Sequence, residues 1–523
     1  MLNFFLNKRI SILYFIPFFL GLITVLSFQP FNFSLINFIV LPILFLLIVY
    51  VNKGSKSTYR KKPYKKNLFI LGFVFSFGFY LAGVFWISNS LTFDDNFRFL
   101  IPFAIIFIPF FLSFFNALII MIIGQFLSYN FPSVLLFSAS LALSDYIRGK
   151  ILTGFPWNLW GYSFSWVNEG LQTLNIFGLY AFNLIVITIF TIPAVFFLRH
   201  NLNKKIIILS FFFIFIFLNF IYGTYSINKN KSLINYISKD EKIFVKVVSP
   251  NFKLKYDQSI NEISTKLQKL IRYSDPDPGK KTYFIWPEGV FAGFNYNKIL
   301  VFREMIKENF SKNHFIIFGV NTIDIKTNEY LNSLVIVNNN FEILHQYDKI
   351  KLVPFGEFLP FENFFEKIGL KKITQGYGSF SKGKKQDNII IDKVNILPLI
   401  CYEIIFPELA QSVDKTNLII NISEDGWFGN TIGPHQHFAK AIFRSIENNS
   451  FLVRSANKGI SAVIDNKGQI VKRLDINETG NIEAFIPLFK TEYKSKNDLI
   501  FFILLFTYLF IFLFFKIRSN GKQ

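Results

Sequence analysis

The sequence LICYE at residues 399–403 contains the only cysteine of the chain, Cys401. An apolar, strand-like run at residues 394–400 leads into it. A lone cysteine is usually a buried small hydrophobe, so Cys401 alone would not indicate a function. Two upstream stretches change that interpretation: WPEG at residues 286–289 and YDKIKLVPFGE at residues 347–357. They offer a carboxylate and an amine at predicted strand ends, and a thiol with such partners is typical of an activated nucleophile.

Composition separates the chain into membrane and globular parts. Hydrophobic residues make up 52% of the 523 residues, and Phe alone accounts for 71, which is more than an ordinary soluble domain needs. Long apolar runs are confined to the two ends of the sequence. We therefore expect a membrane domain with seven transmembrane helices at residues 1–225 and a globular domain at residues 226–498. Residues 499–523 should form an eighth transmembrane helix and a cytoplasmic tail.

Eight apolar runs are long enough to serve as spans. They are residues 10–26, 35–51, 68–88, 99–127, 132–147, 171–198, 206–225 and 499–515. The third run carries Gly72, Gly78 and Gly83, which permit close contact between helices.

Basic residues around these runs predict the orientation of the protein. The membrane part carries 18 Lys and Arg against four Asp and Glu, which is most of the net charge of +21. The loop at residues 52–67 has seven cations and no acid, so the positive-inside rule places it in the cytoplasm. Residues 226–498 then lie outside, which in a bacterium is the periplasmic side of the inner membrane. Nucleic-acid binding is not expected, because the globular part has no basic stripe.

A loop and a charge pair in the membrane part leave two interpretations each. The loop LTGFPWNLWGY at residues 152–162 is too rich in Gly, Pro and Trp to be a span. It fits an aromatic anchor at the membrane interface or a wall along a lipid entry path. Asp145 and Arg148 fit an interhelical ion pair, which is the simpler interpretation, or part of a headgroup site.

In the globular part, short β-rich runs alternate with amphipathic helical stretches, which predicts an α/β domain with two sheets and helices outside. The expected strands are residues 243–248, 283–286, 315–320, 333–337, 389–391, 395–400, 418–422, 451–455, 462–465, 469–473 and 482–486. The expected helices are residues 258–273, 298–309 and 437–448.

Together with Cys401, residues of the two upstream stretches fit a reaction in which the thiol acts as a nucleophile. The thiolate is the nucleophilic form of cysteine, so a base must take the thiol proton, and Glu288 is the candidate. Attack on an acyl carbon builds an oxyanion, which Lys349 and the backbone N–H beyond Cys401 could stabilise. Lys351 competes with Lys349, because the two would share a face of an extended segment.

These motifs resemble those of a known family. The constellation of Glu288, Lys349 and Cys401 is similar to the Glu-Lys-Cys triad of the nitrilase superfamily. The layout of seven spans plus one, with LVPFGEFLP at residues 352–360 and WFG at residues 427–429, more narrowly resembles the apolipoprotein N-acyltransferases. The resemblance implies a nitrilase-like α-β-β-α sandwich domain on an α-helical polytopic membrane domain.

The resemblance also implies a reaction and roles. Cys401 would take an acyl chain from a phospholipid as a thioester and pass it to the N-terminal amine of a diacylglyceryl-cysteine lipoprotein, without metal or cofactor. The family pattern selects Lys349 over Lys351. Its supporting and pocket positions are matched by Glu357, Tyr402, Glu403 and Trp427.

Some positions depart from the family pattern. Glu424 stands where an Asn is frequent, His435 where a bulky aromatic is frequent, and Tyr256 aligns loosely with a Trp; either of the first two could alter the polarity of the pocket. A loop containing Gly376, Gly378 and Gly383 fits a lid over the lipid cleft.

Two other functions share some of these features. A membrane-anchored amidase of the nitrilase type would use the same triad on a small amide, but it needs no platform of several spans. A transporter would need paired charges inside several spans, and these spans are almost uncharged.

Overall fold

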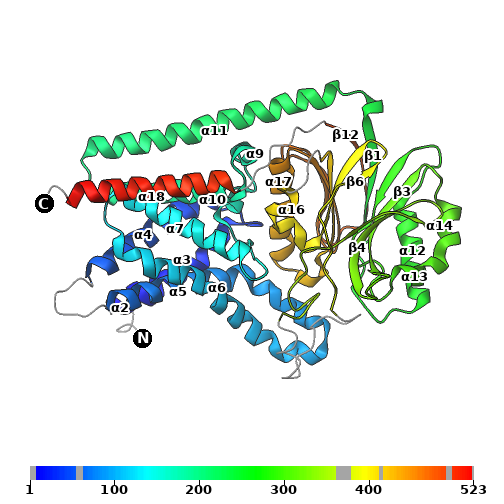
Figure 1. Cartoon of the computed structure of the whole chain (residues 1–523), viewed down its shortest axis with the longest axis horizontal. Coiled ribbons are helices and arrows are strands. Elements are labelled where there is room, and N and C mark those ends of the chain that lie inside the picture. The colour runs from blue at the N-terminus through cyan, green and yellow to red at the C-terminus, as the bar shows by residue number, and fades with distance from the viewer. Residues whose placement is uncertain (1–7, 55–62, 361–378, 412–415, 490–497, 521–523) are drawn as a thin grey trace. The chain divides into compact units, whose positions relative to one another are not determined.

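The computed structural model describes residues 8–54, 63–360, 379–411, 416–489 and 498–520. Its helices and strands are labelled in Figure 1. The chain divides into two compact units. The helical unit comprises Met1–Ser88, Leu100–Tyr225 and Lys496–Gln523, and the sandwich unit comprises Asn89–Phe99 and Ser226–Ser495. Gly376 and Gly378 of the expected lid lie outside the described residues.

The helical unit consists of apolar helices. Its main helices are α3 (Ile16–Thr24), α4 (Asn37–Gly54), α5 (Pro63–Val84), α6 (Ile101–Ile123), α7 (Phe131–Lys150), α10 (Leu179–Thr191), α11 (Leu202–Tyr236, which continues into the sandwich unit) and α18 (Leu499–Asn520). Six helical segments of the described chain are long and apolar enough to cross a membrane: Ser34–Lys53, Tyr64–Phe93, Asp95–Phe126, Leu179–Phe197, Leu202–Tyr236 and Leu499–Arg518. The first expected span is a shorter apolar helix, Ser11–Ser27. The fifth corresponds to α7, whose last turns carry charged residues.

One expected span boundary is wrong, and one helix extends beyond its expected span. The sixth span was expected from residue 171, but Gly178, with φ of +74°, separates the short helix α9 (Leu174–Phe177) from α10. The seventh span was expected to end at residue 225, which is where the helical unit ends, and helix α11 continues beyond it to Tyr236. Polarity rises after residue 225 without a Gly or Pro, and a change of polarity alone does not end a helix.

Helices α3 and α5 cross in close contact. A Cβ atom at Gly78 would lie 2.3 Å from the carbonyl oxygen of Phe18, and one at Gly21 would lie 2.0 Å from that of Phe75. Neither position accommodates a side chain without a backbone shift. The structure thus confirms the close helix contact expected at Gly78.

The Trp-rich loop is packed inside the helical unit. The side chains of Trp157 and Trp160 are only 1% and 3% exposed. The ring of Trp157 lies 4.6 Å from that of Trp86, and Trp160 stacks on Phe79 at 5.6 Å between centroids. An anchor with rings turned out to the membrane interface is therefore wrong for these two residues.

Asp145 and Arg148 form an ion pair within one helix rather than between helices. Both lie in α7, with 2.9 Å between Asp145 Oδ1 and Arg148 Nη2. Arg148 also donates to the carbonyl of Phe155. Asn183 on α10 donates to Asp145 Oδ2 at 3.0 Å and accepts from the N–H of Gly161 at 3.0 Å. The pair holds the Trp-rich loop between α7 and α10.

The sandwich unit contains two six-stranded sheets. The first has the order β12-β1-β2-β3-β4-β5 and the second the order β11-β10-β9-β8-β7-β6. The strands are β1 (Lys242–Ser249), β2 (Thr282–Ile285), β3 (His314–Ile323), β4 (Tyr330–Val337), β5 (Ile343–Asp348), β6 (Ile389–Ile391), β7 (Val394–Ile400), β8 (Leu418–Glu424), β9 (Phe451–Asn457), β10 (Ser461–Ile464), β11 (Ile470–Leu474) and β12 (Gly480–Pro487). Strand β5 was not among the expected runs.

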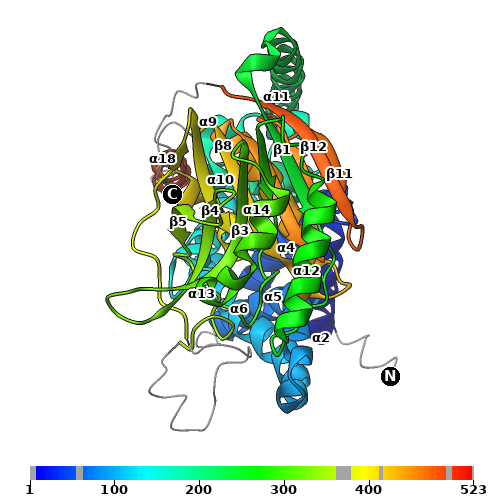
Figure 2. The same ribbon diagram turned by 90° about the vertical axis from the view of Figure 1, so that its right-hand side faces the viewer.

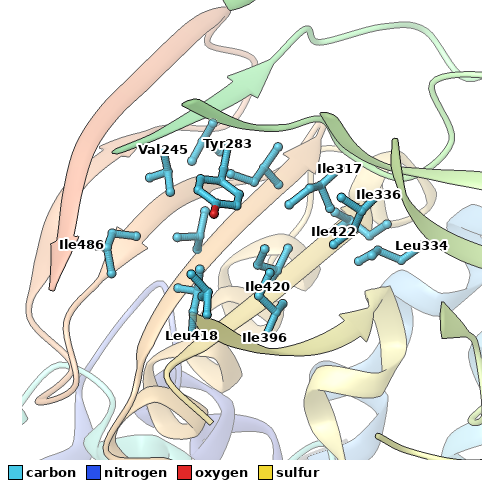
Figure 3. Packing of buried hydrophobic residues seen from close by; sticks show 14 of the residues in the cluster. Val245, Tyr283, Ile317, Leu334, Ile336, Ile396, Leu418, Ile420, Ile422 and Ile486 are labelled. Carbon is cyan, nitrogen blue, oxygen red and sulfur yellow. The ribbon is translucent and has the colours of Figure 1, made fainter. Parts of the chain in front are cut away.

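Apolar side chains fill the space between the sheets. Figure 3 shows Val245, Tyr283 and Ile317 of the first sheet facing Leu418 and Ile420 of the second. Successive side chains of a strand point to opposite faces of the sheet, so the neighbouring residues of β2 and β3 point outward and pack against the helical layer.

Helices cover the outer faces of the sandwich. Figure 2 shows α12 (Ile260–Ser274), α13 (Tyr296–Ile299) and α14 (Arg303–Asn309) over the first sheet. Helices α16 (Pro407–Gln411) and α17 (Gly433–Asn448) lie beside the second sheet (Figure 1). The expected α-β-β-α sandwich is confirmed.

Candidate active site

The ends of four strands carry the candidate residues. Strands β1, β2 and β3 run parallel, and so do β7, β8 and β9. Strand β5 is antiparallel to β4, which is antiparallel to β3, so β5 points the same way as β2. Glu288 follows β2, Lys349 follows β5, Cys401 follows β7 and Glu424 ends β8. Parallel strands present their carboxyl ends at one edge, so two sheets supply the site together.

Lys349 lies buried between two carboxylates. Its Nζ is 2.8 Å from Glu357 Oε1 and 3.5 Å from Glu288 Oε1, and its side chain is 1% exposed. Burial alone lowers the pKa of Lys349, but the charges of Glu288 and Glu357 outweigh it and raise the pKa above its usual value. The lysine is therefore a fixed ammonium that can face a developing negative charge.

Lys351 has a different environment. Its side chain is partly exposed, and its Nζ lies 3.4 Å from Glu408 Oε1. The structure brings Lys349, and not Lys351, to Glu288. The structure therefore distinguishes the two lysines, which their spacing in the sequence could not do.

Asn332 joins the two carboxylates. Its Nδ2 donates to Glu288 Oε1 at 2.9 Å and to Glu357 Oε1 at 2.7 Å, and its backbone carbonyl accepts from the N–H of Lys349 at 2.8 Å. Sequence analysis missed this residue, because an Asn inside a strand has no pattern that marks it. Asn332 also precedes the strand expected at residues 333–337, whereas β4 begins at Tyr330.

Cys401 forms a sharp corner between β7 and a short 3-10 helix, Cys401–Ile405. Its φ is +50°, a left-handed conformation that non-glycine residues seldom adopt. Burial and the charge of Glu288 raise the pKa of Cys401, and Lys349 opposes them. The thiol is therefore protonated at rest and depends on a base to become a nucleophile.

Glu403 fastens the lysine segment to the cysteine segment. Its Oε1 accepts from the backbone N–H groups of Ile350 at 2.7 Å and Lys351 at 3.1 Å, and from the Tyr347 hydroxyl at 2.9 Å. Its Oε2 accepts from the N–H of Ile400 at 2.9 Å. Burial raises the pKa of Glu403 to about 7, although these backbone donors oppose the shift. Glu403 therefore links the segment after β5 to the end of β7, which fits the supporting role expected for it.

Glu357 closes a turn beside the lysine. Its Oε2 accepts from the N–H of Val353 at 2.8 Å, and its own N–H donates to the carbonyl of Val353 at 2.8 Å. Glu357 is thereby held in the position in which it meets Lys349.

The aromatic candidates lie in two places. Trp427 has ring contacts with Phe93 at 4.8 Å and with Tyr256 at 6.0 Å, and its carbonyl accepts from Asn89 Nδ2 at 3.0 Å. The ring of Tyr402 packs edge-on against Phe406, at 5.0 Å between centroids. Asn89 and Phe93 were missed, because in the sequence they follow the third span and only the fold assigns them to the sandwich unit.

Glu424 lies directly beside the candidate base. Its backbone N–H donates to Glu288 Oε2 at 3.1 Å, and its side chain accepts from Asn457 Nδ2 at 2.7 Å and from the N–H of Gly426 at 2.9 Å. Burial raises the pKa of Glu424 to about 8, opposed by these two donors and supported by the charge of Glu288.

The two histidines near this region lie in the first turns of α17. His435 is half-buried and burial lowers its pKa, whereas His437 is fully buried next to Asp425. Within the described ranges, no three His, Cys, Asp or Glu side chains form a group that could hold a metal ion.

Comparison with known proteins covers most of the chain. Residues 20–192 match the apolipoprotein N-acyltransferase N-terminal domain, and residues 284–492 match the carbon-nitrogen hydrolase family. The chain is 32% identical over 496 residues to an apolipoprotein N-acyltransferase of Bradyrhizobium diazoefficiens, covering 89% of this chain and 88% of the relative. It is 29% identical over 491 residues to a protein of the same name from Rhizobium leguminosarum bv. trifolii, covering 90% and 89%. Among solved structures, a branch 10 nitrilase superfamily member of Saccharomyces cerevisiae aligns over 47% of this chain and 90% of its own, with 18% identity and a TM-score of 0.35.

Proposed function

The chain belongs to the apolipoprotein N-acyltransferase family, and from this premise we propose that it acylates the N-terminal amine of diacylglyceryl-cysteine lipoproteins. The acyl donor is a phospholipid, and Cys401 carries the chain between donor and acceptor as a thioester. The observation that carries the proposal is the buried ion pair of Glu288 and Lys349, which lie beyond the ends of β2 and β5 as Cys401 lies at the end of β7.

The first half-reaction loads the enzyme. Glu288 takes the proton from the Sγ of Cys401, and the thiolate attacks the ester carbonyl carbon of the phospholipid. The oxyanion that forms is stabilised by the ammonium of Lys349 and by the backbone N–H of Tyr402. When it collapses, the carbon–oxygen bond to glycerol breaks. Glu288 returns the proton to the glycerol oxygen, and a lysophospholipid leaves.

The second half-reaction transfers the chain. The α-amine of the lipoprotein attacks the thioester carbonyl, and Glu288 takes a proton from the amine nitrogen. The same two donors stabilise the second oxyanion. The carbon–sulfur bond then breaks, an amide is formed, and the sulfur regains its proton from Glu288. Both steps use one base and one oxyanion site.

The membrane part of the chain supports a lipid donor. We propose a multi-pass protein of the bacterial inner membrane, with residues 226–498 as a catalytic domain on the periplasmic side. The basic loop at residues 52–67 and the basic C-terminal end of the last helix, with Lys516 and Arg518, support this orientation through the positive-inside rule.

An amidase acting on a small soluble amide is not favoured. The relatives that match along about nine-tenths of the chain carry the acyltransferase name, and the match includes the helical N-terminal domain. A hydrolase would transfer the acyl group to water and would gain nothing from this domain.

Incubation of the full-length protein with a phospholipid and a diacylglyceryl-cysteine peptide tests the proposal. Mass spectrometry of the peptide should show the gain of one acyl chain. The Cys401→Ala variant should give no gain. An unmodified peptide together with free fatty acid would indicate a hydrolase and contradict the proposal.

A further inference from the structure

His437 contacts the backbone of the candidate nucleophile. It lies in α17, is fully buried, and its Nε2 is 3.2 Å from the carbonyl oxygen of Cys401. Its Nδ1 is 2.9 Å from Asp425 Oδ1 and 3.1 Å from Arg454 Nη2. Neither half-reaction described above uses this histidine, so its contact with Cys401 requires an explanation of its own.

The groups around His437 form a closed polar cluster. Arg454 Nη2 donates to Asp425 Oδ2 at 2.7 Å, and Ser423 Oγ donates to Asp425 Oδ1 at 2.7 Å. Arg454 also donates to the side chain of Asn421 and, from Nε, to the carbonyl of Ile460 at 3.2 Å. Asp425 and Arg454 have no exposed side-chain surface. A buried and satisfied cluster of this kind fixes the ring of His437 in one orientation.

The partners of His437 allow two positions for its proton. Burial lowers the pKa of His437, and although Asp425 raises it, Arg454 and Lys440 add to the lowering, so the ring is neutral. A neutral imidazole donates from one nitrogen only. With the proton on Nε2, the ring donates to Cys401 while Nδ1 accepts from Arg454. With the proton on Nδ1, the ring donates to Asp425 Oδ1 at 2.9 Å and a lone pair faces the carbonyl oxygen of Cys401. The contact with Cys401 is a hydrogen bond only in the first arrangement, which is the one that the inference requires.

A bond to the carbonyl of Cys401 also controls the next N–H group. In a trans peptide the C=O and the following N–H point in opposite directions. Holding the oxygen of Cys401 toward α17 therefore turns the N–H of Tyr402 to the other side of the peptide. The left-handed φ of Cys401 is a costly conformation that persists only when its surroundings restrain it.

We propose that His437 is a positioning residue that anchors the Cys401–Tyr402 peptide so that the Tyr402 N–H faces the acyl oxygen of the substrate. The inference rests on the proposed function, because an oxyanion forms only if Cys401 attacks an acyl carbonyl. In this inference His437 acts on the oxyanion through the Cys401–Tyr402 peptide.

Two amide substitutions distinguish the contacts made by the two ring nitrogens. The amide of Asn reaches about as far as Nδ1, so His437→Asn keeps a polar group for Asp425 and Arg454 but loses the contact with Cys401. The amide of Gln reaches about as far as Nε2, so His437→Gln keeps a donor for the Cys401 carbonyl. Both variants are neutral and differ by one methylene group.

Two reactions of the same thiol provide the readouts for the full-length protein in detergent. The first is the rate of acyl-enzyme formation from a fluorescent phospholipid, which passes through an oxyanion. The second is the rate of alkylation of Cys401 by iodoacetamide, which forms no oxyanion. We expect His437→Asn to slow acylation about 10-fold to 100-fold and to change the rate of alkylation by less than about twofold. For His437→Gln we expect both rates to stay within about fivefold of the wild-type rates.

Several outcomes would overturn the inference. Acylation of His437→Asn at the wild-type rate would remove the positioning role. An equal loss of acylation and alkylation would show a merely structural role. Thermal unfolding will show whether His437→Asn is folded. If it is not, slow acylation by a folded His437→Gln variant would contradict the inference. A wild-type thiol that is alkylated but never acylated would instead contradict the proposed function, and with it this inference.

Discussion

At the scale of single residues, the site depends on one ammonium group held by two carboxylates. Lys349 lies between Glu288 and Glu357, and Asn332 donates to both carboxylates. The amide and the ammonium allow two negative groups to lie close together in a buried site. Removing one member of such a cluster leaves a buried charge unpaired, which typically costs about 3–5 kcal/mol. The cluster therefore holds Glu288, the proposed base, in place as well as the lysine.

The sequence predicted the proposed reacting residues better than the residues that hold them in place. Glu288 and Cys401 were predictable because each follows an apolar strand-like run, and the structure places them at strand ends. Lys349 could be separated from Lys351 only by a family pattern, because both would lie on one face of an extended segment. The contact of His437 with Cys401 was not predictable, because it joins residues 36 positions apart through the packing of α17.

Glu424 predicts a dependence of stability on pH. Its folded pKa of about 8 lies above the ordinary value of 4.5, so between these values the folded protein binds more protons than the unfolded chain. The stabilisation is complete below about pH 4.5 and is lost as the pH rises toward about 8, by at most about 1.4 kcal/mol per pH unit. The neutral variant Glu424→Gln should therefore gain thermal stability relative to the wild type as the pH rises from 5 to 8.

The matched control is Glu308→Gln, at an exposed position on α14. Thermal unfolding of the full-length proteins, followed by Trp fluorescence, should give a difference between Glu308→Gln and wild type that is the same at each pH. A difference for Glu424→Gln that is equally flat would mean that Glu424 is ionised in the folded protein.

At the scale of elements, the strands with continuous apolar runs were predictable and β5 was not. Strand β5 has the sequence ILHQYD and alternates half-buried and exposed residues at the edge of its sheet. His and Gln interrupt the apolar pattern, so the run resembles a loop in the sequence. Its pairing with β4 supplies the order that the pattern lacks, and this pairing brings Lys349 to the site.

The contact between α3 and α5 predicts a strong effect for a small change. Gly78→Ala would place a Cβ 2.3 Å from a backbone oxygen of α3, so the helices must separate. Overpacking of this kind typically costs about 1–3 kcal/mol, more than the gain in helix propensity from Gly to Ala of about 1 kcal/mol. We expect a lower midpoint of thermal unfolding in detergent for the Gly78→Ala variant.

Gly170→Ala provides a control in the same unit. Its Cβ would meet only ordinary contacts, the nearest at 3.7 Å from Phe164 and Val167. This variant should unfold at or slightly above the wild-type temperature. A Gly78→Ala variant as stable as Gly170→Ala would contradict the tight helix crossing.

At the scale of the whole molecule, composition predicted a membrane part and a globular part, but it did not assign every segment to the correct part. Residues 89–99 follow an apolar span and would be counted with the helices, yet they group with the sandwich unit. Within that unit Asn89 and Phe93 hold Trp427. Contacts between residues more than 300 positions apart leave no periodic pattern, so only the fold could supply them.

The central claim is that Cys401 carries the acyl chain, and the mass of the intact protein tests it most directly. After incubation with a phospholipid of defined chain length and no acceptor, the wild-type protein should gain the mass of one acyl chain. Hydroxylamine should remove it, because a thioester is labile to this reagent, and Cys401→Ala should gain nothing. A chain attached to another residue, or acylation of an acceptor peptide by Cys401→Ala, would contradict the account.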